Sequence, residues 1–274
     1  MITQENKLLI VKMYNEGSSL SELSRLFAID TTVIKSILNE YNIHIRTRGE
    51  QTRLTNMKRS KSVDNFYFSN INTINKAWML GFLAADGSIA KERNTISIAL
   101  STVDREILEK IKEEIKIEKT IYDSETNNGF LVSKLEWSSL QQKTDLSKYD
   151  IVNNKTYLPI HLPHFDNDNL TLAYILGYFD GDGSITINNN KYLRFRICSH
   201  RNEILQDIAN FIEKKYGATY SLNQDKRKLY ELSISTTYAI PLLNDCYNLN
   251  SIHLDRKYQK YLEYKRNQET TTSM

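Results

Sequence analysis

Two aspartates stand at the same place in two nearly identical stretches of this chain. The first stretch reads AWMLGFLAADGSI over residues 77–89 and contains Asp86, and the second reads AYILGYFDGDGSI over residues 173–185 and contains Asp182. All thirteen positions align at a constant offset of 96 (173 − 77), and seven of them are identical. In a chain with only nine glycines, this agreement indicates a duplicated element whose two copies act as a pair.

Small residues recur at every fourth position of each stretch, namely Ala77, Gly81 and Ala85 in the first and Ala173, Gly177 and Gly181 in the second. Positions four apart share one face of an α-helix, so each stretch predicts a helix with a nearly bare stripe. Two such helices can pack closer than the usual axis separation of about 8–10 Å. If the stripes meet about a pseudo-twofold axis, Asp86 and Asp182 lie side by side at the helix ends.

Two carboxylates at neighbouring helix C-termini repel each other, and each also meets the negative end of a helix dipole. A hard divalent cation with oxygen ligands removes this cost, and Mg²⁺ keeps positions free for water and phosphate oxygens. Gly87 and Gly183 follow the two acids and allow the backbone to turn sharply. We therefore predict a Mg²⁺ (or Mn²⁺) site formed by Asp86, Asp182, Gly87 and Gly183.

Two other interpretations of the motif were weighed. The segment DGDGS suggests a calcium loop, but the required glycine position falls on Ile185 and the twelfth position on Lys191. The first copy also has Ala84 where the second has Asp180, which excludes an EF-hand. A packing motif with incidental acids explains the small residues, but it does not explain an aspartate at the end of both copies.

The elements around this pair begin with three short helices in residues 1–45, where Gly17 ends the first, Ser19 precedes the second and Asp30 can cap the third. In the third helix, Val33, Ile34, Ile37 and Leu38 are expected to face inward, and the outer face consists of Thr31, Thr32, Lys35, Ser36 and Asn39. A short helix, a three-residue turn and a second helix with a small, polar outer face are typical of a helix-turn-helix that binds DNA. A three-helix bundle without DNA contacts is the alternative.

A basic segment follows these helices. Six cations accompany Glu50 alone, and they are Arg46, Arg48, Arg53, Lys58, Arg59 and Lys61. Polarity and the lack of sustained periodicity predict a linker over residues 46–65. A nucleic-acid backbone is the partner that suits such a segment best, although solvated basic linkers are also common.

Beyond residue 65 one order of elements is predicted twice, over residues 66–160 and 161–274. Each half reads as a helix, two hairpins separated by a helix, and a final helix. The predicted fold class is therefore α+β, with a duplicated core and a small all-α domain in front of it.

The two stretches, above all LGYFDGDGSI, resemble the paired motifs of the LAGLIDADG homing endonucleases in their single-chain, two-motif form, and the resemblance covers residues 66–265. It implies two αββαββα halves whose antiparallel sheets form a saddle over double-stranded DNA. It also implies that Asp86 and Asp182 bind the metal and that Asp180 occupies a supporting position. The first copy departs from the pattern with Ala84, so we expect asymmetry between the two halves.

The same resemblance implies a lysine late in each half, near the metal. Lys155 and Lys257 occupy matching places, 69 residues after Asp86 (155 − 86) and 75 after Asp182 (257 − 182). Ordinary surface lysines are the alternative. Readout of the DNA sequence is then expected from outward side chains of the hairpins, which are Lys191, Arg194, Arg196, Gln224, Lys226, Arg227 and Lys228.

These observations predict a monomeric, site-specific endonuclease that hydrolyses both strands of a long, asymmetric DNA target with a divalent metal. A transcriptional regulator on the same fold is one alternative, and an intron RNA maturase, with intron RNA as its partner, is another. No apolar run approaches the 18 residues of a membrane span, and the first residues lack the pattern of a signal peptide. We expect a cytoplasmic protein of a bacterial or phage-infected cell, or an organellar one.

Overall fold

The computed structural model describes residues 2–61, 63–189, 191–226 and 228–272, and the side chains of residues 53, 56–61 and 270–272 lie outside this description. Contacts divide the chain into two compact units, Met1–Lys61 and Ser62–Met274. Each unit has its own hydrophobic core.

The first unit contains the helices α1 (Gln4–Asn15), α2 (Leu20–Phe27), α3 (Thr31–Glu40) and α4 (Arg48–Lys61). The predicted helix caps are confirmed, because the Ser19 hydroxyl accepts from the N–H of Glu22 and the Asp30 carboxylate accepts from the N–H of Thr32. A turn of residues 28–30 joins α2 to α3. Three helices around one small core therefore precede α4.

Two expectations for this unit differ from the structure. Val33 is 41% exposed and does not face inward, whereas the other three apolar side chains predicted for that face are buried. The sequence predicted a linker over residues 46–65, but α4 occupies much of that range. Its start carried a signal, because Thr47 and Glu50 bond each other's backbone N–H reciprocally, as a T-x-x-E capping box does.

The second unit repeats one order of elements. The first copy consists of α5 (Ile74–Asp86), β1 (Gly87–Ile89), β2 (Thr95–Ser101), the 3₁₀ helix η1 (Thr102–Asp104), α6 (Arg105–Glu114), β3 (Tyr122–Glu125), β4 (Leu131–Ser138), α7 (Leu140–Ser147) and the 3₁₀ helix η2 (Lys155–Tyr157). The second consists of α8 (Asp168–Asp182), β5 (Gly183–Asn188), β6 (Tyr192–Ser199), α9 (Asn202–Tyr216), β7 (Tyr220–Gln224), β8 (Tyr230–Ile234) and α10 (Thr236–Asn248), and α11 (Asp255–Thr272) follows.

Each copy forms a four-stranded antiparallel sheet, and the strand orders β1-β2-β4-β3 and β5-β6-β8-β7 are the same. Equivalent apolar pairs lie at equivalent register positions, with Ile98 opposite Leu135 in the first sheet and Ile197 opposite Leu232 in the second. All four side chains are fully buried, so one face of each sheet packs on the core and the other stays open. The predicted duplicated α+β fold is confirmed.

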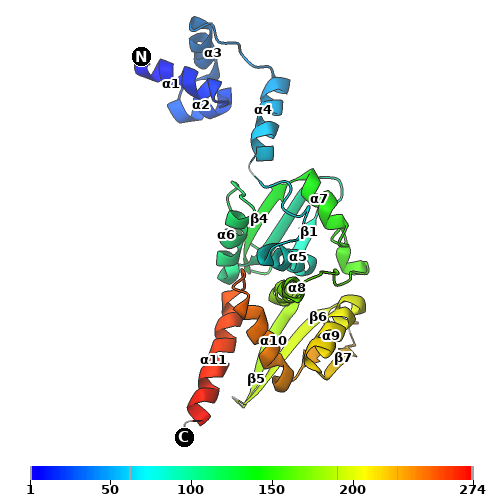
Figure 1. Ribbon diagram of the computed structural model, residues 1–274. Helices are drawn as coiled ribbons and strands as arrows, with labels where there is room; N and C mark the ends of the chain where they lie inside the picture. Colours follow the sequence, from blue (N-terminus) through cyan, green and yellow to red (C-terminus); the bar gives the residue numbers. More distant parts are fainter. Residues whose placement is uncertain (1, 62, 190, 227, 273–274) are drawn as a thin grey trace. The chain divides into compact units, whose positions relative to one another are not determined.

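Helices α5 and α8 lie side by side between the two sheets (Figure 1). A Cβ on Gly81 would collide with the carbonyl oxygen of Tyr174, and a Cβ on Gly177 would collide with that of Trp78. The two glycines therefore let the backbones touch reciprocally, and the predicted contact of the bare helix faces is confirmed. Large side chains such as Trp78 and Tyr174 fill the core on either side of the contact.

We predict that Gly177→Ala lowers the free energy of unfolding of this unit by about 3 kcal/mol or more, because the added methyl group must push two backbones apart. Chemical denaturation followed by tryptophan fluorescence measures the effect. Gly217→Asn is the control, since Gly217 has a φ of +63° and open space around it. Asparagine tolerates that conformation, so the control should cost about 1 kcal/mol or less. Equal losses in the two variants would contradict the proposed contact.

Candidate functional site

The two repeated aspartates end the paired helices. Asp86 is the last residue of α5 and Asp182 the last residue of α8, and both side chains are half-buried. A Cβ on Gly181 would lie 3.3 Å from Cγ of Asp86, so the Asp86 carboxyl group rests against the neighbouring helix. The close helix contact thus brings both acids to one end of the helix pair.

Two buried lysines cap the C-terminal ends of these helices. Nζ of Lys155 donates to the carbonyl oxygen of Ala85 at 2.6 Å, and Nζ of Lys257 donates to those of Phe179 and Asp180 at 2.6 and 2.7 Å. The lysines are 7% and 3% exposed. The last carbonyls of a helix have no partner within the helix and carry the negative end of its dipole, so an ammonium group there is stabilised. The structure therefore places both predicted lysines beside the acids.

Arg201 is a further cation in this site, and the sequence analysis missed it. Its Nη2 donates to the hydroxyl of Tyr178 at 2.9 Å and to the carbonyl oxygen of Ala84 at 3.4 Å, and its Nη1 donates to the carbonyl oxygen of Lys155 at 3.3 Å. The side chain is 7% exposed. Arg201 is the N-cap of α9, where the helix dipole disfavours a cation. That unfavourable position was the available signal.

Burial and mutual repulsion perturb the pKa of each charged group. Burial first, and the charge of Asp182 second, raise the pKa of Asp86 to about 6. Burial also raises the pKa of Asp182, while the nearby charge of Lys155 lowers it. Burial lowers the pKa of Lys155 and of Lys257 to about 8. The acids and lysines thus lie close enough to interact, and each stabilises the charged form of the other.

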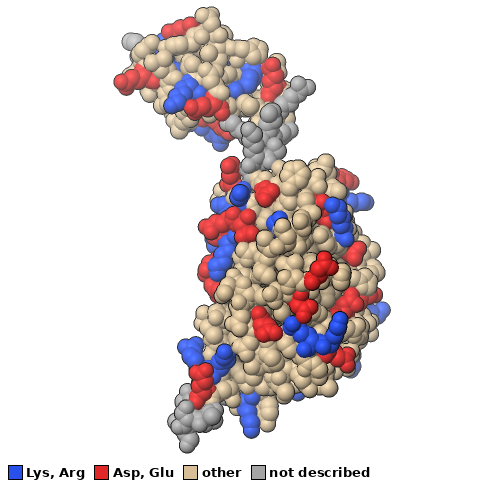
Figure 2. Space-filling view, viewed as in Figure 1, with Lys and Arg blue, Asp and Glu red and all other residues tan. Residues whose placement is uncertain are grey.

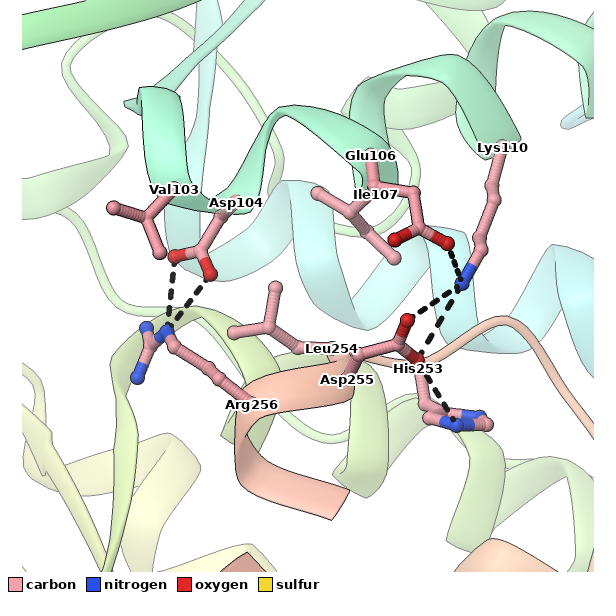
Figure 3. Close-up of a pocket in the computed structure, with 9 residues that line it drawn as sticks. All are labelled: Val103, Asp104, Glu106, Ile107, Lys110, His253, Leu254, Asp255 and Arg256. Carbon is pink, nitrogen blue, oxygen red and sulfur yellow. Dashed lines mark hydrogen bonds and ion pairs between the residues drawn. The ribbon is translucent and has the colours of Figure 1, made fainter. Parts of the chain in front are cut away.

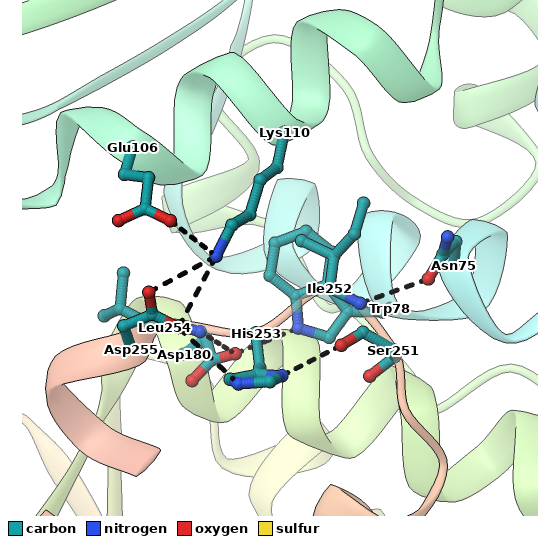
Figure 4. Close-up of polar contacts among 10 residues, drawn as sticks. All are labelled: Asn75, Trp78, Glu106, Lys110, Asp180, Ser251, Ile252, His253, Leu254 and Asp255. Atoms are coloured by element: carbon teal, nitrogen blue, oxygen red, sulfur yellow. Dashed lines mark hydrogen bonds and ion pairs between the residues drawn. The ribbon is translucent and has the colours of Figure 1, made fainter. Parts of the chain in front are cut away.

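Asp180 joins the two copies (Figure 4). Its Oδ2 accepts from Nε1 of Trp78 at 2.9 Å and from the N–H of Leu254 at 3.1 Å, and the side chain is 2% exposed. The first copy has Ala84 here, and the equivalent aromatic residue, Tyr174, has a buried hydroxyl without a hydrogen-bond partner among the described residues. The supporting position predicted for Asp180 matches these contacts, as does the predicted asymmetry.

Gly87 and Gly183 differ from the expectation that a sharp turn requires them. Both have extended backbones, with φ of −68° and −100°, which any residue can adopt. A Cβ on either glycine would instead collide with the last turn of its own helix, at Leu83 or Phe179. Each glycine therefore allows the strand that follows to begin in contact with the last turn of its own helix.

The acid pair fits a Mg²⁺ ion. Its half-buried oxygen ligands repel each other when both ionise, and Mg²⁺ is commonly held by one or two carboxylates together with water and phosphate oxygens. Within the described parts of the chain, no group of three or more His, Cys, Asp or Glu side chains is arranged to hold a metal. Asp86 and Asp182 would thus hold the ion in an open site, and the ligand roles of Gly87 and Gly183 stay predictions.

Two of the predicted readout residues project from the open face of the second sheet. Arg194 and Arg196 alternate on β6 with buried apolar residues and therefore project from the open face. Nη1 of Arg196 lies 3.7 Å from Oε2 of Glu231. Four more predicted side chains are exposed, and these are Lys191, Gln224, Lys226 and Lys228. Arg227 lies outside the described residues.

The predicted outer face of α3 is confirmed as a surface, because Thr32, Lys35, Ser36 and Asn39 are exposed and Thr31 is partly exposed. Among the cations that follow, Arg48 is exposed, and the side chain of Arg53 lies outside the described part of the chain.

Arg46 differs from the expectation that it extends toward DNA. Its guanidinium stacks 3.8 Å from the ring centroid of Tyr14 and donates to the carbonyl oxygens of Tyr14 and Ser18. Arg46 therefore joins the segment after α3 to the helices of the first unit, which explains why it is not available as a free basic side chain.

The charge on the visible face of residues 63–272 is mixed, with blue and red side chains interspersed (Figure 2).

In the described residues, no helix combines the length and the apolar character that a membrane crossing requires.

Comparison with known proteins identifies the duplicated region. A family model described as a LAGLIDADG-like domain matches residues 73–156 and 169–241. An uncharacterized protein of Methanocaldococcus jannaschii, MJ0314, is 25% identical over 202 residues, which cover 72% of each chain.

Two solved structures share lower identity. The I-LtrWI LAGLIDADG homing endonuclease bound to target DNA is 17% identical, with a TM-score of 0.48 over 72% of this chain and 91% of that one. The N-terminal LAGLIDADG domain of DUF199/WhiA is 15% identical, with a TM-score of 0.45 over 67% of this chain and 86% of that one.

We predict that Asp86→Asn stabilises the metal-free protein at pH 8 by about 1 to 3 kcal/mol. The pKa of Asp86 is about 6 in the folded chain, above the value of about 4 in an unfolded chain. The contribution of this carboxyl group to stability is therefore fully present below pH 4 and lost as the pH rises through 6. Asparagine cannot ionise, so the difference should vanish near pH 4.

Urea denaturation in EDTA at the two pH values measures this difference. Asp166→Asn, which removes a fully exposed carboxylate, is the control and should show no such pH dependence. A variant less stable than the wild type at pH 8 would contradict the repulsion between the two acids.

Proposed function

The chain belongs to the LAGLIDADG-like domain family, and we propose that it is a site-specific endonuclease that cuts both strands of DNA with a divalent metal. The observation that carries the proposal is the meeting of Asp86 and Asp182 at one end of two helices whose backbones touch. A protein that only binds DNA gains nothing from two facing carboxylates, because they repel phosphates. Both acids come from one chain, so we propose that it acts as a monomer.

The acids and lysines divide the work of hydrolysis between them. Bound Mg²⁺ would supply an activated water and would stabilise negative charge on the phosphate and the leaving oxygen. Asp86 and Asp182 would hold the metal, and their raised pKa values indicate that both acids gain from a cation. No covalent intermediate with the protein is needed.

Lys155 and Lys257 act beside them. Each Nζ is fixed by bonds to helix-end carbonyls, so it offers positive charge to a phosphate without reorganisation. A pKa of about 8 leaves a fraction of each lysine neutral in mildly alkaline solution, and this fraction can accept a proton from the attacking water.

The surfaces that contact DNA are proposed from exposure and charge. Arg194 and Arg196 read bases from the open face of the second sheet, and exposed residues at its turns contact phosphates. The outer face of α3 forms a second contact in the manner of a helix-turn-helix. Together they support a long target without two-fold symmetry.

We predict that Asp182→Asn lowers the cleavage rate by about a thousandfold or more and leaves DNA affinity within about threefold, because the acid holds metal and does not touch bases. Duplexes selected for binding from a randomised pool in Ca²⁺ are transferred to Mg²⁺ or EDTA, and cleavage is followed on gels. Asp166→Asn is the matched control and should cleave normally.

Measurements of cleavage, DNA binding and intron splicing together separate the alternatives. Tight binding by the wild type without cleavage in Mg²⁺ or Mn²⁺ would favour a regulator. Stimulation of intron splicing by Asp86→Asn would favour a maturase. Loss of binding in Asp182→Asn would mean that the acid serves folding.

We also predict that the first unit adds salt-dependent affinity. Removing residues 1–61 should weaken binding and its salt dependence but retain cleavage, because the second unit has a core of its own. In the full chain, Lys35→Ala should reduce the slope of log affinity against log salt by about 1. Lys7→Ala is the control, because that ammonium is already paired with Glu40 at 2.8 Å. An unchanged slope for Lys35→Ala would contradict a DNA contact by α3.

A further inference from the structure

The two halves differ in charge at two equivalent positions near the acids. Asp104 is the N-cap of α6, and Arg201 is the N-cap of the equivalent helix α9. Asn154 precedes Lys155, and Arg256 precedes Lys257. Each side of the site therefore combines residues of both halves, because Arg256 donates to Asp104 on one side and Arg201 donates to the carbonyl oxygen of Lys155 on the other.

Arg201 is not available to a substrate. Its Nε, Nη1 and Nη2 all donate to protein oxygens, which belong to Ser199, Lys155, Ala84 and Tyr178. Since each of its three nitrogens donates to a protein oxygen, its guanidinium serves the interior of the site.

Arg256, in contrast to Arg201, is exposed and has guanidinium nitrogens that do not bond to the described protein residues (Figure 3). Its Nε donates to both carboxylate oxygens of Asp104 at 2.9 and 3.0 Å, and its side chain is 53% exposed. In the described parts of the chain, neither Nη group donates to a protein acceptor. Asp104, whose side chain is only 11% exposed, thus fixes the guanidinium while leaving its outer edge free.

The backbone beneath Arg256 is also fixed. Lys257, the next residue, is buried, and its N–H donates to the carbonyl oxygen of Leu254. Asp255, on the other side, accepts from Lys110, which also pairs with Glu106 of α6 (Figure 3). The residues on both sides of Arg256 are therefore fixed by hydrogen bonds, which limits the movement of its backbone.

Arg256 stands beside the end of α8, because Lys257, the next residue, donates to the carbonyl oxygens of Phe179 and Asp180. Arg201 lies at the end of α5, where it donates to the carbonyl oxygen of Ala84. The C-terminal ends of the two helices thus have different arginine neighbours, one with a free guanidinium edge and one whose nitrogens all donate to the protein.

We propose that Arg256, oriented by Asp104, binds the scissile phosphate of one of the two strands, and that the other strand has no such arginine. A guanidinium with a free edge suits a phosphate, because it donates two parallel hydrogen bonds. This inference rests on the proposed endonuclease activity. It implies that the two strands are cut at unequal rates, with Arg256 assisting one cut and Asp104 acting as its positioning residue.

Cleavage of a duplex labelled on either strand tests the proposal. Arg256→Ala should slow one strand by about a hundredfold and the other by no more than about threefold, so that nicked product accumulates. Arg256→Lys keeps the positive charge but cannot donate two parallel hydrogen bonds, so it should recover only part of the lost rate. Asp104→Ala should slow the same strand less, and melting temperatures identify any variant that fails to fold. Lys215→Met is the control, because that cation lies outside the site and is already paired with Asp168 at 2.9 Å.

Equal slowing of both strands by Arg256→Ala, or no slowing, would overturn the proposal. A wild-type protein that never cleaves DNA would refute the proposed endonuclease activity. It would not refute the contact between Arg256 and a phosphate, which a second measurement tests. In Ca²⁺, Arg256→Ala should reduce the salt slope of DNA binding by about 1, and Lys215→Met should leave it unchanged. Equal slopes for the wild type and Arg256→Ala would remove the phosphate contact itself.

Discussion

The backbone contact between α5 and α8 is the constraint on which the site depends. Gly81 and Gly177 each occupy a place where no side chain fits, and the carbonyl oxygens of Tyr174 and Trp78 fill it instead. Helices held at ordinary separation would carry their terminal acids further apart. The same contact joins the two sheets into one unit, so the fold and the acid pair have a single origin.

Charge balance at the helix ends follows from that contact. Three carboxylates gather there, those of Asp86, Asp180 and Asp182, and burial raises the pKa of each. Buried cations accompany them and satisfy the carbonyls that end the two helices. An isolated buried charge is costly, and here each charge is stabilised by opposite ones.

The sequence predicted the duplication, the order of elements and the meeting of the acids, because these depend on repeats and on local periodicity. It placed the two lysines by resemblance. The contacts of Arg201 and of Arg256 could not be predicted, since they join segments far apart in the chain whose pairing only the folded sheets determine. The role of Gly87 was misread because tight packing and a sharp turn both call for glycine, and sequence alone does not distinguish them.

Contacts that cross between the repeats have made them co-adapted. Trp78 of the first repeat needs the carboxylate of the second, and two copies of the first repeat would leave its indole facing an alanine, Ala84. Two copies of the second repeat would set Arg201 against Arg256, with no Asp104 between the like charges. Neither repeat is interchangeable with the other, so a symmetric ancestor could not be recovered by simply doubling either half of the present chain.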